Sequence, residues 1–159
     1  MKHEKIAKVL RAFSVAAGII GGLLFFWFTP LYIDEIITMS PEVAFLGWPA
    51  KIGMWLIALV CYWALYHFFK VCAHIQNGNS FCEDNVLNMK NIGNAAMLVA
   101  VLIFTGNLYL LFAGWLHPGI IIISFFFIFI AASFAVISYA LSYLIDNAVK
   151  IKEENDLTI

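Results

Sequence analysis

Four long segments without a single Asp, Glu, Lys or Arg constrain this chain more than any other feature of its sequence. They cover residues 12–33, 52–69, 92–116 and 119–145. A helix needs about 20 mostly apolar residues to cross the hydrocarbon core of a bilayer, and each segment approaches or exceeds that length. Only 12% of the 159 residues are charged, well below the proportion in a soluble domain. The sequence therefore predicts an all-α polytopic membrane protein with four transmembrane helices in an antiparallel bundle.

The stretches outside these segments are too short for a second folded domain. We therefore expect residues 1–159 to form a single membrane domain. Residues 70–91 are expected to form a helical hairpin and residues 146–159 a tail, both extending helices into the cytoplasm. The first segment is interpreted as a span and not as a cleaved signal peptide, because its apolar core is long and no small-residue cleavage site follows.

The distribution of cations predicts the orientation of the chain. Eight of the nine Lys and Arg residues lie on one side of the predicted membrane, and only Lys51 lies on the other side. The positive-inside rule then places both termini and the hairpin in the cytoplasm. Cys72 and Cys82 lie on this reducing side, so no disulfide is expected.

The stretch between the second and third spans contains the signals of a turn between two helices. Asn77 and Gly78 are typical of a helix stop with glycine in the left-handed conformation. Ser80 and Glu83 fit a capping box at the start of a new helix. That helix is expected to run unbroken into the third span.

Small residues predict where the helices pack closely. Gly18 and Gly22 form a GxxxG pair in the first span. We interpret this pair as a packing site within the chain in preference to a dimer contact. The fourth span carries a stripe of small residues at helical spacing: Ala131, Ala135, Ser138 and Ser142.

The predicted outer connection, residues 32–49, contains signals for a short helix. Pro30 is expected to kink the span just before it. Ser40 fits an N-cap and Pro41 a first helical position, and the helix is expected to run through Leu46 and end at Gly47. This connection contains three acids, Asp34, Glu35 and Glu42. They are interpreted either as part of a solvated loop or as a site for a cation or a basic peptide.

A few polar side chains fall within the spans. An amide such as Asn107 needs a partner in lipid, so it is expected to face the bundle, as helix glue or as part of a ligand cavity. His67 is interpreted as an interfacial histidine. The residues of this candidate intramembrane site are Asn107, Thr105, His67 and Tyr62.

No pattern in the sequence supports catalysis or metal binding. The His and Cys residues show neither CxxC nor HxxxH spacing, and no HExxH motif is present. We therefore expect no catalytic residue, metal or cofactor, and the chain is not interpreted as an enzyme.

The C-terminal residues are unusual for a helix end. Glu153, Glu154 and Asp156 oppose the helix dipole. Leu157 and Ile159 are apolar side chains at a chain end, where fraying is expected. Two interpretations stay open, a solvated tail and a tail docked against the cytoplasmic hairpin.

Two motifs together resemble a known family. The first has Gly78, Phe81, Glu83, Asp84 and Asn85 before a membrane helix. The second is the terminal EENDLTI, which consists of Glu153, Glu154, Asn155, Asp156, Leu157, Thr158 and Ile159. With four spans, they resemble the bacterial membrane-protein family catalogued as domain of unknown function 2975. The chain departs from the family pattern at Ser80 and Cys82, where Pro and Ser are common.

The resemblance implies a location and a partner. It implies a multi-pass protein of the bacterial cytoplasmic membrane, from a family that has no assigned reaction. Its members are often encoded beside a short Cro-like helix-turn-helix protein, which implies a regulatory membrane protein that binds this regulator through its cytoplasmic face. Binding or transport of a small apolar molecule or lipid within the bundle is the alternative. Direct binding of nucleic acid is not expected, because the basic residues are scattered, and a homo-oligomer is compatible with the sequence.

Overall fold

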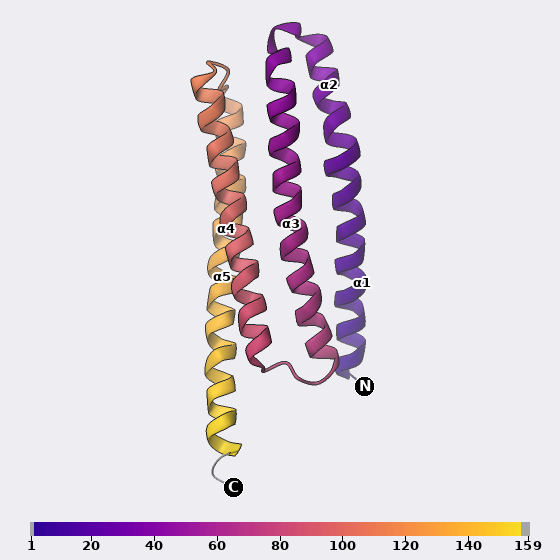
Figure 1. Cartoon of the computed structure of the whole chain (residues 1–159), viewed down its shortest axis with the longest axis vertical. Helices are drawn as coiled ribbons and strands as arrows, with labels where there is room; N and C mark the ends of the chain where they lie inside the picture. Colours follow the sequence, from indigo (N-terminus) through magenta and orange to yellow (C-terminus); the bar gives the residue numbers. More distant parts are fainter. Residues whose placement is uncertain (1, 157–159) are drawn as a thin grey trace.

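The fold is a set of long helices (Figure 1). The computed structural model describes the backbone of residues 2–156 and the side chains of residues 8–155. Within residues 2–156 there is no strand. Four helical stretches are long and apolar enough to cross a membrane: Lys8–Met39, Pro41–Gln76, Glu83–Phe112 and Pro118–Asn155. The predicted all-α membrane fold is confirmed.

The first membrane stretch is a continuous rod of three parts. α1 (Lys2–Gly22) passes into a π-helical segment, η1 (Leu23–Phe28), and then into α2 (Thr29–Met39). Pro30 lies at the start of α2 and cannot donate a hydrogen bond to the preceding turn. The Thr29 hydroxyl donates to the Leu24 carbonyl at 2.8 Å. The disturbance expected at Pro30 therefore takes the form of a widened turn on its N-terminal side.

The connection to the second stretch differs from two expectations. η2 (Pro41–Leu46) is a short 3-10 helix, and Ser40 at its N-cap makes no side-chain cap hydrogen bond. Gly47 does not end this helix but begins α3 (Gly47–Gln76). Gly47 is buried, and a Cβ atom on it would collide with the Ile37 side chain. The absence of a Cβ atom at Gly47 therefore lets the start of α3 pack closely against α2, and Gly47 does not act as a helix stop.

The turn between α3 and α4 (Glu83–Phe112) begins as predicted and ends differently. Gly78 has a φ of +73°, which confirms the left-handed glycine. The predicted capping box is wrong, because the N-cap is Cys82 and it makes no side-chain cap hydrogen bond. Cys82 has an extended backbone, and its carbonyl accepts from the Asn85 amide at 3.0 Å. The Asn85 side chain donates to the Ser80 carbonyl at 2.9 Å. The unbroken helix into the third span is confirmed.

The last helix, α5 (Pro118–Asp156), packs along α4 through small residues. Of the four residues in the predicted packing stripe, Ala135, Ser138 and Ser142 are buried and Ala131 is half-buried. On α4, a Cβ atom added to Gly93 would lie 2.8 Å from the Tyr139 ring. The Ser142 hydroxyl donates to the Val86 carbonyl at 2.9 Å and adds a polar link between the two helices.

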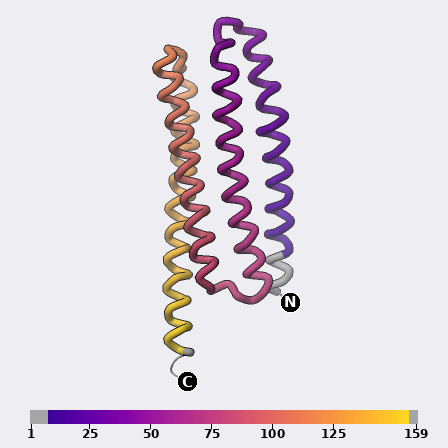
Figure 2. The backbone as a smooth tube through the Cα atoms, in the orientation of Figure 1, coloured from indigo at the N-terminus to yellow at the C-terminus, as the bar shows by residue number. Residues whose placement is uncertain are grey.

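The helices follow one another in space in chain order (Figures 1 and 2). α3 contacts α1 on one side and α4 on the other, and α4 contacts α5. Within the described residues the backbones of α1 and α5 do not approach each other closely, so the bundle is open along that side. The start of α1, the α3–α4 turn and the end of α5 lie at one end, which we name the termini end.

Candidate functional site

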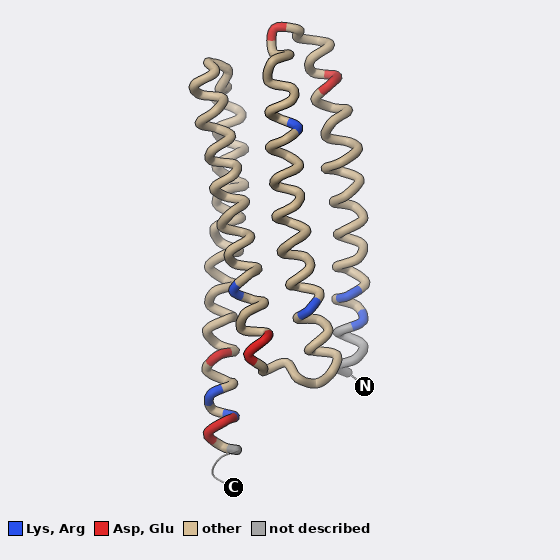
Figure 3. Tube along the Cα trace, in the orientation of Figure 1, with Lys and Arg blue, Asp and Glu red and all other residues tan. Residues whose placement is uncertain are grey.

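The termini end carries most of the charged positions of the described chain (Figure 3). Positions occupied by Lys or Arg lie at similar heights on α1, α3 and α4 toward this end. Arg11 belongs to α1, Lys70 to α3 and Lys90 to α4. Glu83 and Asp84, in the first turn of α4, lie farther from the middle of the bundle. On α5 the two signs are interleaved, with Lys150 and Lys152 between Asp146 and Glu153. A concentration of Lys and Arg at this end suits the end of a bundle that leaves the membrane on its cytoplasmic side.

The end of α5 extends beyond the rest of the chain. Val149 is its last buried residue, and every side chain from Lys150 to Asn155 is exposed. We name residues 150–156 the α5 projection, which passes the level of the α3–α4 turn (Figure 1). Lys150 donates to Asp146 at 2.7 Å, and this hydrogen bond raises the pKa of the lysine. Glu153, Glu154 and Asn155 lie on the projection, and α5 ends at Asp156.

The last part of the tail motif, Leu157, Thr158 and Ile159, lies outside the described residues. Whether the tail docks against the hairpin therefore stays a prediction.

The turn motif divides into residues that shape the turn and residues that are available to a partner. Gly78 supplies the left-handed conformation. Asn85 is only 1% exposed, and its Oδ1 atom has no hydrogen-bond partner among the described residues. Phe81, in contrast, is 56% exposed, and Glu83 is also exposed. An exposed aromatic ring beside an acid is the part of this motif that a binding partner can contact.

His67 has a buried partner that the sequence did not reveal. Its Nδ1 atom lies 2.8 Å from Oδ1 of Asn88 on α4. With the carboxamide oxygen facing the ring, Nδ1 carries the proton and donates. The rings of Trp63 and Tyr66 lie edge-on to the imidazole, with centroids 5.7 and 5.4 Å away. His67 therefore links α3 to α4, which supports its interpretation as a satisfied structural histidine.

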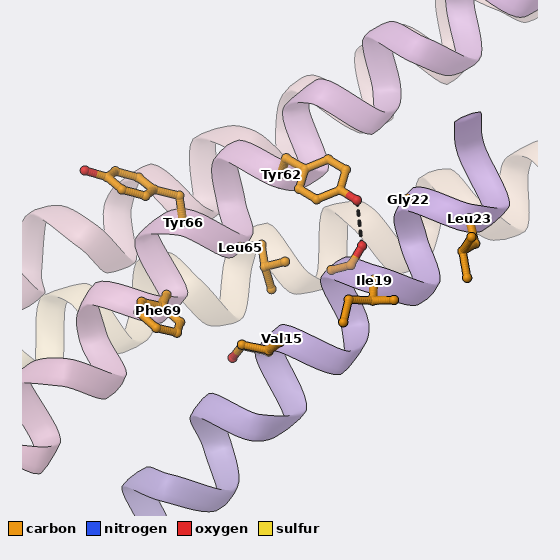
Figure 4. Close-up of a pocket in the computed structure, with 10 residues that line it drawn as sticks. Val15, Ile19, Gly22, Leu23, Tyr62, Leu65, Tyr66 and Phe69 are labelled. Atoms are coloured by element: carbon orange, nitrogen blue, oxygen red, sulfur yellow. Dashed lines mark hydrogen bonds between the residues drawn. The ribbon is translucent and has the colours of Figure 1, made fainter. Parts of the chain in front are cut away.

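Tyr62 links α3 to α1 (Figure 4). Its hydroxyl donates to the Gly18 carbonyl at 2.6 Å. A Cβ atom on Gly22 would lie 2.7 Å from the same hydroxyl, and one on Gly18 would lie 3.1 Å from Leu65. The GxxxG pair is thus packed within the chain, as predicted. A groove of about 670 Å³ follows this contact between α1 and α3.

The other two residues of the candidate intramembrane site make different contacts. Thr105 is exposed, and its hydroxyl donates to the Val101 carbonyl of its own helix at 2.8 Å. Asn107 is half-buried, and its shielded Nδ2 atom has no hydrogen-bond partner in the described part of the chain. The hydrogen bonds of the described residues therefore do not join these four residues into one polar site.

An apolar cleft of about 470 Å³ lies between all four long helices. Ala17, Leu65, Val99 and Phe134 contribute one lining side chain from each of α1, α3, α4 and α5. Apart from Ser14, the lining residues are apolar, and neither Thr105 nor Asn107 is among them. The cleft suits a hydrocarbon chain better than a polar substrate.

A side-chain cluster at the α3–α4 turn was missed by the sequence analysis. Cys82 Sγ lies 3.8 Å from His74 Nδ1, and His74 Nε2 lies 4.0 Å from Asp84 Oδ2. Only the fold of the turn places these residues together, because no spacing rule links them. Across residues 8–155, no group of three or more His, Cys, Asp or Glu side chains is placed to hold a metal ion.

Four long apolar helices joined by short turns define an integral membrane protein of the four-span class. The chain belongs to the family described as "Protein of unknown function (DUF2975)", whose profile matches residues 31–159. It is 30% identical over 157 residues to the "Uncharacterized membrane protein YoaS" of Bacillus subtilis (strain 168), covering 98% of this chain and 94% of that protein. No solved structure matches. The family predicted from the turn and tail motifs is confirmed.

Proposed function

We propose that this protein is a regulatory membrane protein without enzymatic activity, which holds a small helix-turn-helix regulator at the cytoplasmic face of the bacterial cytoplasmic membrane. The termini end supplies the binding surface. The positive-inside rule supports this orientation, because Arg11, Lys70 and Lys90 lie at the termini end. Lys51, near the opposite end, is engaged by Asp34 at 2.5 Å.

The α5 projection is the observation on which the proposal rests. Seven residues continue the helix by about 10 Å beyond its last packed turn. Ile151 is 60% exposed on this projection. A single exposed apolar side chain is common on protein surfaces, so the support comes from the projection as a whole, a helical segment beyond the packed bundle that a partner protein can contact.

The charge of this surface suggests the kind of partner. The acids at the termini end include Glu83 and Asp84 in the first turn of α4 and Glu153 and Glu154 on the projection, where Lys150 and Lys152 also lie. A DNA-binding protein carries a basic surface that contacts phosphates. Acids that contact this basic surface would compete with DNA, so binding at the membrane would lower the amount of regulator on its operator.

Co-purification with a short Cro-like helix-turn-helix protein, the kind of partner that the family resemblance implies, tests the proposal. We expect the double variant Glu153→Lys, Glu154→Lys to retain less than about a tenth of the regulator, because it reverses two charges on the contact surface. The matched control is Glu35→Lys, Glu42→Lys, which makes the same change in exposed acids near the opposite end. The proposal is contradicted if the Glu153→Lys, Glu154→Lys variant retains as much regulator as the wild type. It is also contradicted if this variant and the Glu35→Lys, Glu42→Lys control lose equal amounts of regulator.

The apolar cleft favours a second candidate function, the binding of a lipid or another apolar molecule. Its volume of about 470 Å³ is within the range of small-molecule sites. Ala17→Phe would fill part of the cleft from α1. A long-chain fatty acid should raise the unfolding midpoint of the wild type in detergent and leave this variant unchanged. An equal rise in both proteins would contradict binding in the cleft.

A further inference from the structure

The α3–α4 turn holds a thiol, an imidazole and a carboxylate in a row. His74 comes from the last turn of α3, Cys82 caps the start of α4, and Asp84 lies in its first turn. The sulfur lies 3.8 Å from His74 Nδ1, and the opposite ring nitrogen, Nε2, lies 4.0 Å from the Asp84 carboxylate. This order matches the arrangement in which a base activates a nucleophile while a third group orients the base.

The position of Cys82 favours reaction in two further ways. It is the N-cap of a 30-residue helix, next to the backbone N–H groups of the first turn that have no partner within the helix. It is also half-buried, so a small reagent can reach it. Cys72 has no exposed surface, and Cys61 lies within the second apolar span. Cys82 is therefore the thiol in this chain that combines access with an adjacent base.

We propose that Cys82, His74 and Asp84 form a thiol-exchange site that reacts with low-molecular-weight disulfides. The Cys82 thiol gives its proton to His74 Nδ1, and the resulting imidazolium is stabilised by Asp84 at Nε2. The sulfur of Cys82 attacks one sulfur of the disulfide and forms a new S–S bond. The original S–S bond breaks, and its electron pair leaves with the departing thiolate. A free thiol reverses the reaction by the same exchange.

The exchange places a substituent at the first turn of α4, beside Phe81 and Glu83. It therefore changes the surface of the turn in response to the thiol–disulfide balance of the surrounding solution. The inference does not depend on the proposed regulator, because the reaction needs only this chain and a small disulfide.

The test measures modification of the whole protein in detergent by the aromatic disulfide dithionitrobenzoate. The released thiolate gives the rate, and mass spectrometry of peptides locates the adduct. We expect Cys82 to react before Cys61 and Cys72. His74→Asn should slow its reaction by about tenfold or more, because the proton acceptor is lost. An unchanged rate in this variant, or first reaction at another cysteine, overturns the proposal.

Asp84 acts through His74 and is a positioning residue, so its test needs a readout separate from folding. Asp84→Asn should slow the exchange severalfold and Asp84→Glu should restore it, with unchanged unfolding midpoints, because the Asp84 side chain is 76% exposed. Glu83→Gln is the matched control, since it removes a neighbouring charge in the same turn. Equal slowing by Glu83→Gln and Asp84→Asn would show a general charge effect and contradict the specific role of Asp84.

Discussion

The two halves of the bundle differ in how tightly they are packed. Toward the termini end, α4 buries Asn85, Asn88, Ile92 and Gly93, and hydrogen bonds from His67 and Ser142 join it to its neighbours. Along the other half of α4, from Val101 to Phe112, no residue is fully buried. The half nearest the proposed cytoplasmic surface is therefore held by specific contacts, while the opposite half presents mainly apolar side chains to lipid.

A glycine pair on α4 provides the strongest test of this difference. Gly93→Leu should lower the stability by about 1–3 kcal/mol, because its side chain would collide with the Tyr139 ring. Gly106→Leu is the matched change in the loose half, where an added Cβ meets nothing within 4 Å. Unfolding midpoints in detergent measure both effects. Similar losses in the two variants would contradict the difference in packing.

The buried pair of His67 and Asn88 provides a second, smaller test. His67→Leu leaves the Asn88 amide without its partner and should cost about 1–2 kcal/mol. The double variant His67→Leu, Asn88→Leu should recover most of this loss, because no buried polar group is then left unpaired. The same unfolding measurement applies, and strictly additive losses would mean that the two side chains are not coupled.

The ion pair between Lys51 and Asp34 should have the smallest effect. Asp34 is 59% exposed, so solvent screens the pair and Asp34→Asn should change stability by less than about 1 kcal/mol. Unfolding midpoints of the wild type and the variant, measured at increasing salt concentrations, check this expectation. A larger loss than that of His67→Leu would show that the end bearing Lys51 is held more firmly than its packing indicates.

Except for the capping box at the start of α4, the features that depend on the local sequence were predicted correctly. The uncharged segments predicted the spans, and Gly78 predicted the left-handed turn. The small residues of the first and fourth spans predicted close contacts between helices. In each case the responsible property is intrinsic to the segment, either its transfer into lipid or its conformational freedom.

Features that depend on distant neighbours were missed. Asn88 is one of several Asn residues in the chain, and only the packing of α3 on α4 selects it as the partner of His67. The capping box is the exception, because it is a local feature that was still predicted wrongly: the extended backbone of Cys82 places the start of α4 three residues after Ser80. Gly47 was predicted as a helix stop because its close contact with Ile37 is a tertiary feature.

The orientation of the termini end is the claim on which the proposed function depends most directly. It can be measured by labelling Cys82 with a membrane-impermeant maleimide in spheroplasts before and after permeabilisation. A variant with Glu42→Cys reports on the opposite side, where the side chain is exposed. The account predicts that Glu42→Cys is labelled in intact spheroplasts and Cys82 only after permeabilisation. Labelling of Cys82 in intact spheroplasts would contradict the account.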